Sequence, residues 1–115
     1  MIEKSLFEKI VDREISAEIV YEDNLSLAFK DISPQAPKHL LIIPKKRYNR
    51  IAEVPESEKS LLGHLLIVAA KVAMDAGIED SGYRVIINNG KDGGESIPHL
   101  HLHVVGGRPL SWPPG

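Results

Sequence analysis

The sequence predicts an α+β fold, with a mainly antiparallel sheet of five strands, one long helix and one short helix. Short apolar segments separated by turn residues recur at the spacing of hairpins. One longer stretch, ending at Gly77, keeps the period of an amphipathic helix. A chain of 115 residues is long enough for one hydrophobic core. We therefore expect a single domain over residues 1–115.

The first half of the chain is expected to form a short helix and three strands. Glu22–Asn24 is rich in turn residues and predicts a hairpin between the strands that flank it. Two prolines make residues 31–37 a loop, because proline fixes φ and removes a backbone donor. The predicted elements are a helical turn over Ser5–Ile10 and strands over Ile19–Tyr21, Leu25–Lys30 and His39–Ile43.

The second half is expected to form the long helix and the last two strands. Pro55 suits the first turn of a helix, and Glu56 and Glu58 favour its positive end. Apolar residues then recur for about three turns until Gly77, which is expected to cap the helix C-terminus. The predicted strands are Tyr83–Asn88 and His99–Val105, and the glycine-rich loop Gly90–Ser96 joins them.

The composition excludes several classes of protein. Hydrophobic residues make up 43% and charged residues 26%, and the net charge of −2 gives no reason to expect binding to nucleic acid or a membrane surface. The absence of cysteine excludes disulfides and thiolate metal sites. Charged residues interrupt residues 1–15, so neither a signal peptide nor a membrane span is predicted there. We expect a cytoplasmic location, or the nucleus in a eukaryote.

Three alternating histidines occupy the last predicted strand. Side chains of a strand alternate between two faces, so His99, His101 and His103 should share one face. The apolar residues between them should share the other, buried face. A row of imidazoles is a costly packing choice, because histidine titrates near neutrality and charged neighbours repel each other. The pattern therefore indicates a chemical role.

Two kinds of chemistry fit three imidazoles on one face. They could bind zinc and leave a position open for water, or one could be a nucleophile while the others bind an anion. Zinc-bound histidines normally have a carboxylate or carbonyl behind them, and Glu95 is the only acidic residue close in sequence. Gly90–Ser96 offers backbone N–H groups and a hydroxyl for a phosphate. The anion is therefore favoured, with zinc as the alternative.

The histidine segment and several others resemble one known family. His99–Val105 matches the signature His-x-His-x-His followed by hydrophobic residues, which is typical of the histidine-triad (HIT) superfamily. The resemblance is closest to its Hint branch, the histidine triad nucleotide-binding proteins. It implies a HIT-like fold that dimerises into a ten-stranded sheet. The similar segments are Asp31–Pro37, His39–Lys46, Ser60–His64, Asp92–Gly94, Gly106–Arg108 and Trp112–Gly115.

The resemblance implies a purine nucleoside phosphoramidase. Such an enzyme hydrolyses the P–N bond of adenosine 5′-phosphoramidates, including aminoacyl adducts such as lysyl-AMP, to AMP and an amine. His101 would attack the α-phosphorus and form a nucleotidyl-imidazole that water hydrolyses. His103 would contact the phosphate, and Ser96 would lie near the departing nitrogen. His99 would orient His101, and His39 would join the cluster from a neighbouring strand.

The resemblance also implies the nucleotide-binding residues. Asp31 would accept hydrogen bonds from the ribose hydroxyls, although it could instead stabilise its own turn. The other residues of this set are Phe7, Ile15 and Ile32 around the purine, and Asn88, Gly94, Glu95 and Ser96 beside the phosphate. No metal or other cofactor is implied. The expected partners are an AMP-like purine nucleotide and a second copy of the chain, and neither nucleic acid nor a membrane.

Two positions depart from the pattern of the branch. Glu95 stands where glutamine is usual and places a negative charge beside the phosphate site, unless Lys91 or Arg108 pairs with it. Pro98 stands where an aromatic residue is common, and proline is tolerated at the start of a strand. Neither change removes a catalytic group. Both are expected to affect rate and specificity.

Other functions stay open at the level of sequence. The chain could be a nucleotide-binding or partner-binding regulatory protein with incidental hydrolysis, a dinucleoside polyphosphate hydrolase, or a zinc-binding module. The presence of His101, Ser96 and His103 favours the enzyme, because a pure binding protein needs no nucleophile. A dinucleoside polyphosphate hydrolase is not expected to end in Trp112–Gly115. His64 is interpreted as a polar residue on the long helix.

Overall fold

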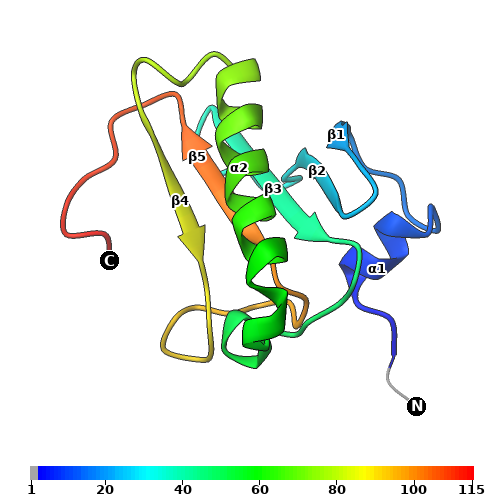
Figure 1. Ribbon diagram of the computed structural model, residues 1–115. Helices are drawn as coiled ribbons and strands as arrows, with labels where there is room; N and C mark the ends of the chain where they lie inside the picture. The colour runs from blue at the N-terminus through cyan, green and yellow to red at the C-terminus, as the bar shows by residue number, and fades with distance from the viewer. Residues whose placement is uncertain (1–2) are drawn as a thin grey trace.

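Five strands form one antiparallel sheet in the order β1-β2-β3-β5-β4 (Figure 1). The computed structural model describes residues 3–115, and every neighbouring pair of strands in it is antiparallel. This confirms the predicted five-stranded α+β fold, and four strands differ from the prediction by no more than one residue at either end. The strands are β1 (Ile19–Glu22), β2 (Ser26–Lys30), β3 (Lys38–Pro44), β4 (Tyr83–Ile87) and β5 (Leu102–Gly106).

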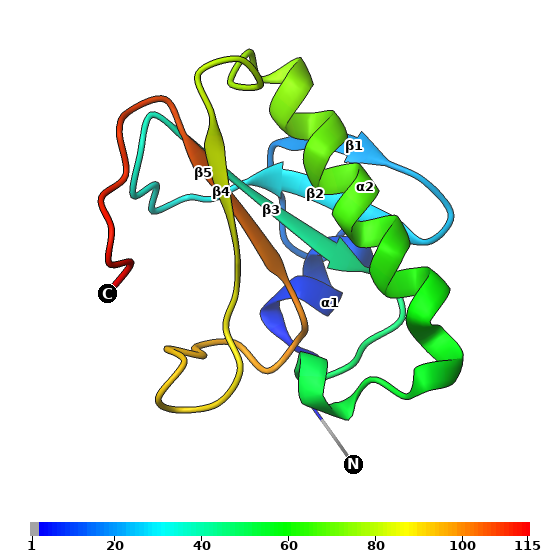
Figure 2. The ribbon, with the colours of Figure 1, turned by 60° about the vertical axis from the view of Figure 1, so that its left-hand side comes forward.

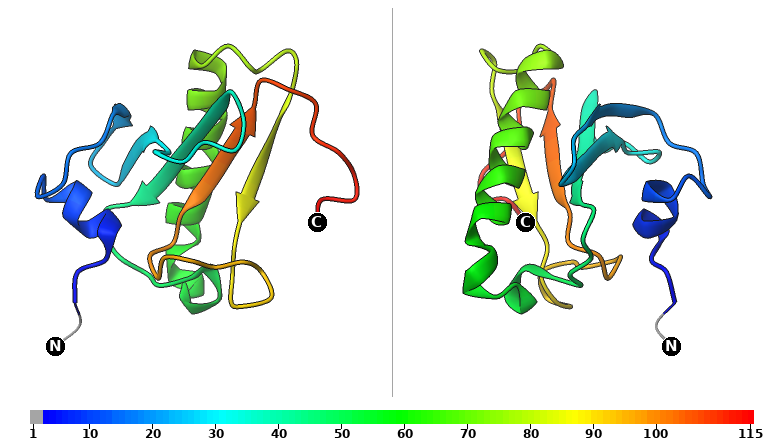
Figure 3. Two further views of the ribbon diagram at one scale, coloured as in Figure 1. Left: turned by 180° about the vertical axis from the view of Figure 1, so that it is seen from behind. Right: turned by 45° about the vertical axis from the view of Figure 1, so that its right-hand side comes forward.

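Helices cover both faces of the sheet. The short helix α1 (Leu6–Val11) and the long helix α2 (Lys59–Asp75) lie on opposite sides, as the right-hand view of Figure 3 shows. Two short 3₁₀ turns, Ile51–Glu53 and Glu56–Glu58, precede α2. None of the helices within residues 3–115 combines the length and the apolar character needed to cross a membrane.

The two ends of α2 differ in how well the sequence predicts them. Gly77 has a φ of +77° and donates its N–H to the carbonyl of Met74, so the predicted C-terminal cap is confirmed. The predicted start at Pro55 is wrong, because α2 begins at Lys59. The intervening residues form a tighter 3₁₀ turn, in which the N–H of Glu58 donates to the carbonyl of Pro55 at 2.9 Å.

The sheet separates two hydrophobic clusters. Along β3, Leu40 and Ile42 pack toward α2, whereas Leu41 and Ile43 pack toward α1. The α2 cluster is the larger, and it also takes residues from β2, β5 and the segment after α2. Burial of one such apolar side chain contributes about 1.5–3 kcal/mol. The α1 cluster consists of Phe7, Ile10, Leu27, Phe29, Leu41 and Ile43.

The last strand starts later than predicted. β5 begins at Leu102, so the segment from His99 to His101 approaches the sheet without joining its ladder. The expectation that only the apolar side of this segment is buried is also wrong: His99 is 0% exposed and His101 is 4% exposed. The cause is the cover on both sides of the sheet, since α1 packs its Phe7 against His99 and His101.

The loop between β4 and β5 folds back on itself, and Figure 2 shows it extending beyond the end of the sheet. The N–H groups of Gly93 and Glu95 both donate to the carbonyl of Gly90, and that of Gly94 donates to Lys91. The side-chain amide of Asn88 donates to the carbonyl of Gly93 at 2.6 Å. Most of the N–H groups that were expected to serve a phosphate are therefore used inside the loop.

Gly93 is predicted to be essential for this loop. A Cβ at this position would lie 2.5 Å from the backbone oxygen of Asn89. Gly93→Ala should therefore lower the free energy of unfolding by roughly 1–3 kcal/mol. Urea denaturation measures the effect, and Asp92→Ala is the matched control, expected to change stability by less than about 0.5 kcal/mol. Equal stabilities for the two variants would contradict the steric argument.

Candidate active site

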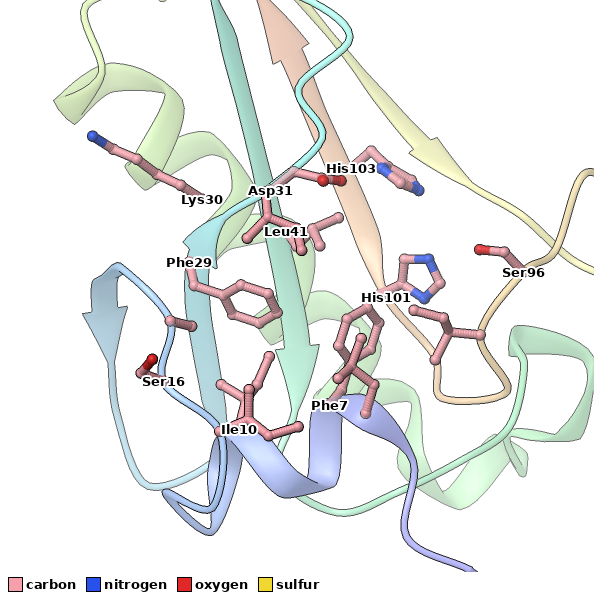
Figure 4. A pocket seen from close by; sticks show the side chains of 15 residues that line it. Phe7, Ile10, Ser16, Phe29, Lys30, Asp31, Leu41, Ser96, His101 and His103 are labelled. Atoms are coloured by element: carbon pink, nitrogen blue, oxygen red, sulfur yellow. The ribbon is translucent and has the colours of Figure 1, made fainter.

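A cavity of about 260 Å³ opens on the α1 face of the sheet (Figure 4). This volume lies just below the range for small-molecule sites, roughly 300–1,000 Å³. One part of its lining is apolar, and the other carries ionisable and hydroxyl groups. The lining residues are Leu6, Phe7, Ile10, Ile15, Ser16, Ala17, Phe29, Lys30, Asp31, Ile32, Leu41, Ser96, Ile97, His101 and His103.

The predicted site residues divide into three groups in the structure. Seven of them line the cavity: Phe7, Ile15, Asp31, Ile32, Ser96, His101 and His103. His39 and His99 lie behind the lining and contact it through hydrogen bonds. Asn88, Gly94 and Glu95 belong to the loop between β4 and β5 and are not part of the lining. The histidines are thus brought together, whereas three of the residues expected at the phosphate lie in the supporting loop.

The His101 ring is oriented by a backbone carbonyl. Its Nδ1 lies 2.7 Å from the carbonyl oxygen of His99. Because a carbonyl oxygen only accepts, Nδ1 carries a proton, and the lone pair of the neutral form of the ring lies on Nε2. In Figure 4 the ring lies at the polar end of the cavity, with Ser96 across from it. An unprotonated imidazole nitrogen can act as a nucleophile.

A chain of hydrogen bonds determines which ring nitrogens of His39 and His103 carry the protons. The backbone N–H of Gln35 donates to Nδ1 of His39 at 3.0 Å, so His39 carries its proton on Nε2. That nitrogen lies 2.8 Å from Nδ1 of His103, which must then accept. His103 is left with its proton on Nε2. Arg108 donates to the carbonyl of Gln35 at 3.0 Å and helps to hold the loop in place.

The surroundings of His103 favour its neutral form. Burial, followed by the neighbouring imidazoles of His101 and His39, lowers its pKa to about 4, and the carboxylate of Asp31 opposes this shift only in part. The ring is therefore uncharged at neutral pH, in agreement with its role as an acceptor at Nδ1. A neutral ring with a proton on Nε2 can still donate a hydrogen bond to an anionic oxygen.

His99 is bonded at both ring nitrogens. Its Nε2 lies 3.0 Å from the carbonyl oxygen of Pro44, and its Nδ1 lies 2.8 Å from the hydroxyl of Ser5. Burial lowers the pKa of His99, which keeps the ring neutral. The side chain therefore cannot reach a ligand. Its contribution to the site is its carbonyl, which holds His101.

Asp31 lies beside the histidines with its side chain 18% exposed. Its Oδ1 accepts from the N–H of Ser33 at 2.8 Å, so it does stabilise its own turn. Its Oδ2 lies 3.4 Å from Nε2 of His39. One oxygen thus holds the loop while the carboxylate still lines the cavity. The two roles considered for Asp31 are compatible.

Aromatic and aliphatic side chains form the other part of the cavity. The ring of Phe7 meets that of His101 edge to face, with centroids 5.0 Å apart, and meets Phe29 at 5.6 Å. Leu41 and Ile10 complete this apolar wall, as Figure 4 shows. Ile32 is 91% exposed although it lines the cavity. An exposed apolar side chain at the edge of an apolar pocket suits a flat aromatic ligand.

Glu95 is paired, but not with the expected residues. Both carboxylate oxygens lie 2.9 Å from the guanidinium of Arg50, and one also accepts from the N–H of Gly90 at 2.9 Å. The arginine and then the backbone N–H lower the pKa of Glu95 to about 2. Neither Lys91 nor Arg108 is the partner. The expected repulsion of a phosphate is therefore offset, and the carboxylate instead fastens the loop.

The zinc arrangement considered from the sequence does not form. His99 has both nitrogens bonded, so the three alternating imidazoles do not converge on one point. Asp31, His39 and His103 do place their donor atoms within 4.8 Å of one another. A metal on Nε2 of His39 would move the proton of that ring to Nδ1, against the N–H of Gln35. These residues therefore do not fit a metal without breaking the hydrogen-bond chain.

Three contributions to the site were missed from the sequence. Ser5 bonds to His99, Arg50 bonds to Glu95, and the backbone of Gln35 sets the proton of His39. Ser5 and Glu8 carry the Ser-x-x-Glu signature of a helix cap, which could have marked Ser5 as fixed in place. Arg50 and Gln35 have no such local signal. His64, by contrast, lies where expected on α2 and contacts Asp23 at 2.7 Å.

Comparison with known proteins places this fold and site in a family. A model of the HIT domain matches residues 12–110, and the chain belongs to this family. It is 55% identical to an uncharacterized HIT-like protein of Synechocystis over the full length of both chains. It is 50% identical to a 14 kDa zinc-binding protein of Zea mays, over 96% of this chain and 88% of that one.

A solved structure shows the same similarity in three dimensions. A HIT family hydrolase from Legionella pneumophila superposes with a TM-score of 0.95 at 48% sequence identity. The match covers 97% of this chain and 100% of the Legionella chain. The resemblance to the histidine-triad superfamily is thus confirmed at the level of the family.

The pKa of His103 predicts a pH dependence of stability. The folded value of about 4 lies below the ordinary value of 6.5, so between these pH values the unfolded chain binds more protons. The free energy of unfolding should therefore fall as the pH drops from 6.5 to 4, by up to roughly 3 kcal/mol from this group. Urea denaturation across this range should show a flatter profile for His103→Gln. An unchanged slope would contradict the assignment.

Proposed function

We propose that the protein is a purine nucleoside phosphoramidase, which cleaves adenosine 5′-phosphoramidates, including aminoacyl adducts such as lysyl-AMP, to AMP and an amine. The observation that carries this proposal is the bond from Nδ1 of His101 to the carbonyl of His99, at 2.7 Å. It leaves the lone pair of Nε2 at the polar end of a cavity that also carries His103 and Ser96. A neutral imidazole is an effective nucleophile at neutral pH.

The reaction follows in two steps on the same phosphorus. Nε2 of His101 attacks, the P–N bond breaks, and the departing nitrogen takes up a proton that comes from solvent through the hydroxyl of Ser96. Water then attacks the nucleotidyl-imidazole, expels His101, releases AMP and returns one proton to the site. Nε2–H of His103 donates to the phosphoryl oxygens, where negative charge is concentrated.

The remaining lining residues suit a purine nucleoside. The apolar wall around Phe7 and Phe29 matches the faces and edges of an aromatic base. The carboxylate of Asp31 can accept the O–H groups of a ribose. The similarity to the Legionella hydrolase supports a hydrolytic reaction. The zinc-binding name of the maize relative does not favour a metal here, because the proton on Nε2 of His39 opposes it.

His101→Ala should remove turnover and keep the fold. We expect kcat for adenosine 5′-phosphoramidate to fall by at least about a thousandfold, because the covalent step is lost. Release of AMP measures the rate, and His64→Asn, on α2 and outside the cavity, is the control. A variant that keeps more than about a tenth of the wild-type kcat would exclude His101 as the nucleophile.

The same assay separates the competing functions. Wild-type protein is compared on adenosine 5′-phosphoramidate and diadenosine polyphosphate, each with and without a chelator. Faster cleavage of the polyphosphate would identify a dinucleoside polyphosphate hydrolase. Loss of activity with chelator and recovery with zinc would identify a metal site. Nucleotide binding with no turnover of either compound would identify a binding protein.

We also propose that the active form is a homodimer whose sheets join through β4. This strand lies at one edge of the sheet, and edge strands are usually covered or paired. Val85 on β4 is partly exposed, as are three large apolar residues of α2. Those residues are Leu66, Ile67 and Met74. Two copies that meet along β4 and α2 would bury this surface.

Ile67→Glu tests the proposed dimer. Ile67 is 70% exposed, and a charge at the seam between two copies would be buried on association. We expect light scattering to show a dimer for the wild type and a monomer for Ile67→Glu. Leu25→Glu changes an equally apolar, exposed residue next to the β1–β2 turn and should stay dimeric. A monomeric wild type would refute the proposal.

A further inference from the structure

We propose that Ser5 is a positioning residue of this site. Its hydroxyl donates to Nδ1 of His99, opposite the nitrogen that donates to Pro44, and so holds in place the residue whose carbonyl orients His101. The effect on turnover rests on the proposed function. The effect on the hydrogen bond at Nδ1 of His99 does not, because it can be measured in the free protein.

The direction of each hydrogen bond follows from its partners. The backbone N–H of Glu8 donates to Oγ of Ser5 at 2.9 Å, so Oγ is the acceptor there. The hydroxyl has one hydrogen, and Nδ1 of His99 lies 2.8 Å away to receive it. The carbonyl of Pro44 can only accept, so Nε2 of His99 carries the proton. The neutral ring with its proton on Nε2 satisfies both contacts.

The position of His99 depends on such contacts because the sheet does not supply them. His99 and His101 precede the first residue of β5, so the ladder that fixes Leu102 to Gly106 does not extend to them. Ser5 is 6% exposed and His99 is 0% exposed. A hydrogen bond between two such buried groups is stronger than one at the surface. Losing one partner leaves the other buried without a hydrogen bond, which costs folding free energy.

Ser5 also joins the orienting histidine to the wall of the cavity. The same hydroxyl caps α1, and Glu8 returns the contact by accepting from the N–H of Ser5 at 2.9 Å. The first turn of α1 carries Phe7, whose ring lies against both His99 and His101. One hydroxyl therefore couples the helix that forms the apolar wall to the segment that carries the nucleophile.

The experiment compares Ser5→Ala, Ser5→Thr and Glu8→Ala. Nitrogen-15 shifts of the histidine side chains report which ring nitrogen carries the proton and whether the other accepts a hydrogen bond. Turnover of adenosine 5′-phosphoramidate gives kcat and KM. Ser5→Ala should keep the proton on Nε2, because Pro44 still accepts it, but should move the shift of Nδ1 toward that of an acceptor without a partner. It should lower kcat by roughly tenfold, with a change in KM below about threefold. Ser5→Thr keeps the hydroxyl and should restore both. Glu8→Ala removes the other half of the cap and should keep the wild-type shifts of His99.

Ser5→Asp provides a second variant if Ser5→Ala fails to fold. Aspartate caps a helix well but offers Nδ1 of His99 an acceptor in place of a donor. His99 should then carry protons on both nitrogens at neutral pH. Wild-type shifts of His99 in either folded variant would overturn the proposal, as would equal losses of kcat in Ser5→Ala and Glu8→Ala. If the wild type does not cleave the phosphoramidate, the proposed function fails, and the nitrogen shifts still decide the role of Ser5.

Discussion

The site depends on one constraint: at each buried imidazole, a hydrogen-bond partner decides which nitrogen carries the proton. Backbone groups supply this partner for His39 and His101. The N–H of Gln35 begins the chain through His39 and His103, and the carbonyl of His99 holds His101. Because a peptide N–H only donates and a carbonyl only accepts, these contacts leave one arrangement of protons. The unprotonated Nε2 of His101 is a consequence of backbone geometry.

The sequence predicts the histidine cluster well, but it predicts poorly the hydrogen bonds that hold the cluster in place. Alternation in His99–His103 indicates a shared chemical role, and the structure brings these residues together with His39. The prediction of one continuous strand was wrong, because periodicity cannot show where the ladder starts. Hydrogen bonds at the ends of a strand depend on residues far away in the chain. Tyr48, whose carbonyl accepts from the N–H of Leu100, lies in the connection before α2.

Glu95 shows why a departure from a family pattern is hard to interpret locally. A carboxylate beside a predicted phosphate site suggests repulsion when only its neighbours in sequence are considered. Its partner, Arg50, is 45 positions away and follows β3 rather than the glycine-rich loop. The ion pair neutralises the charge and ties two loops together. Predicting it would have required the positions of both loops, which short motifs do not give.

The division of the core by the sheet has a consequence for how this protein can change. The larger hydrophobic cluster lies against α2, whereas the cavity lies on the side of α1. Substitutions that improve packing under α2 can raise stability without altering the shape of the cavity, since distant sites usually act independently. Substitutions around α1 alter ligand contacts at a smaller cost to the main core. Evolution, or an engineer, can therefore adjust robustness and substrate choice on separate layers of the same sheet.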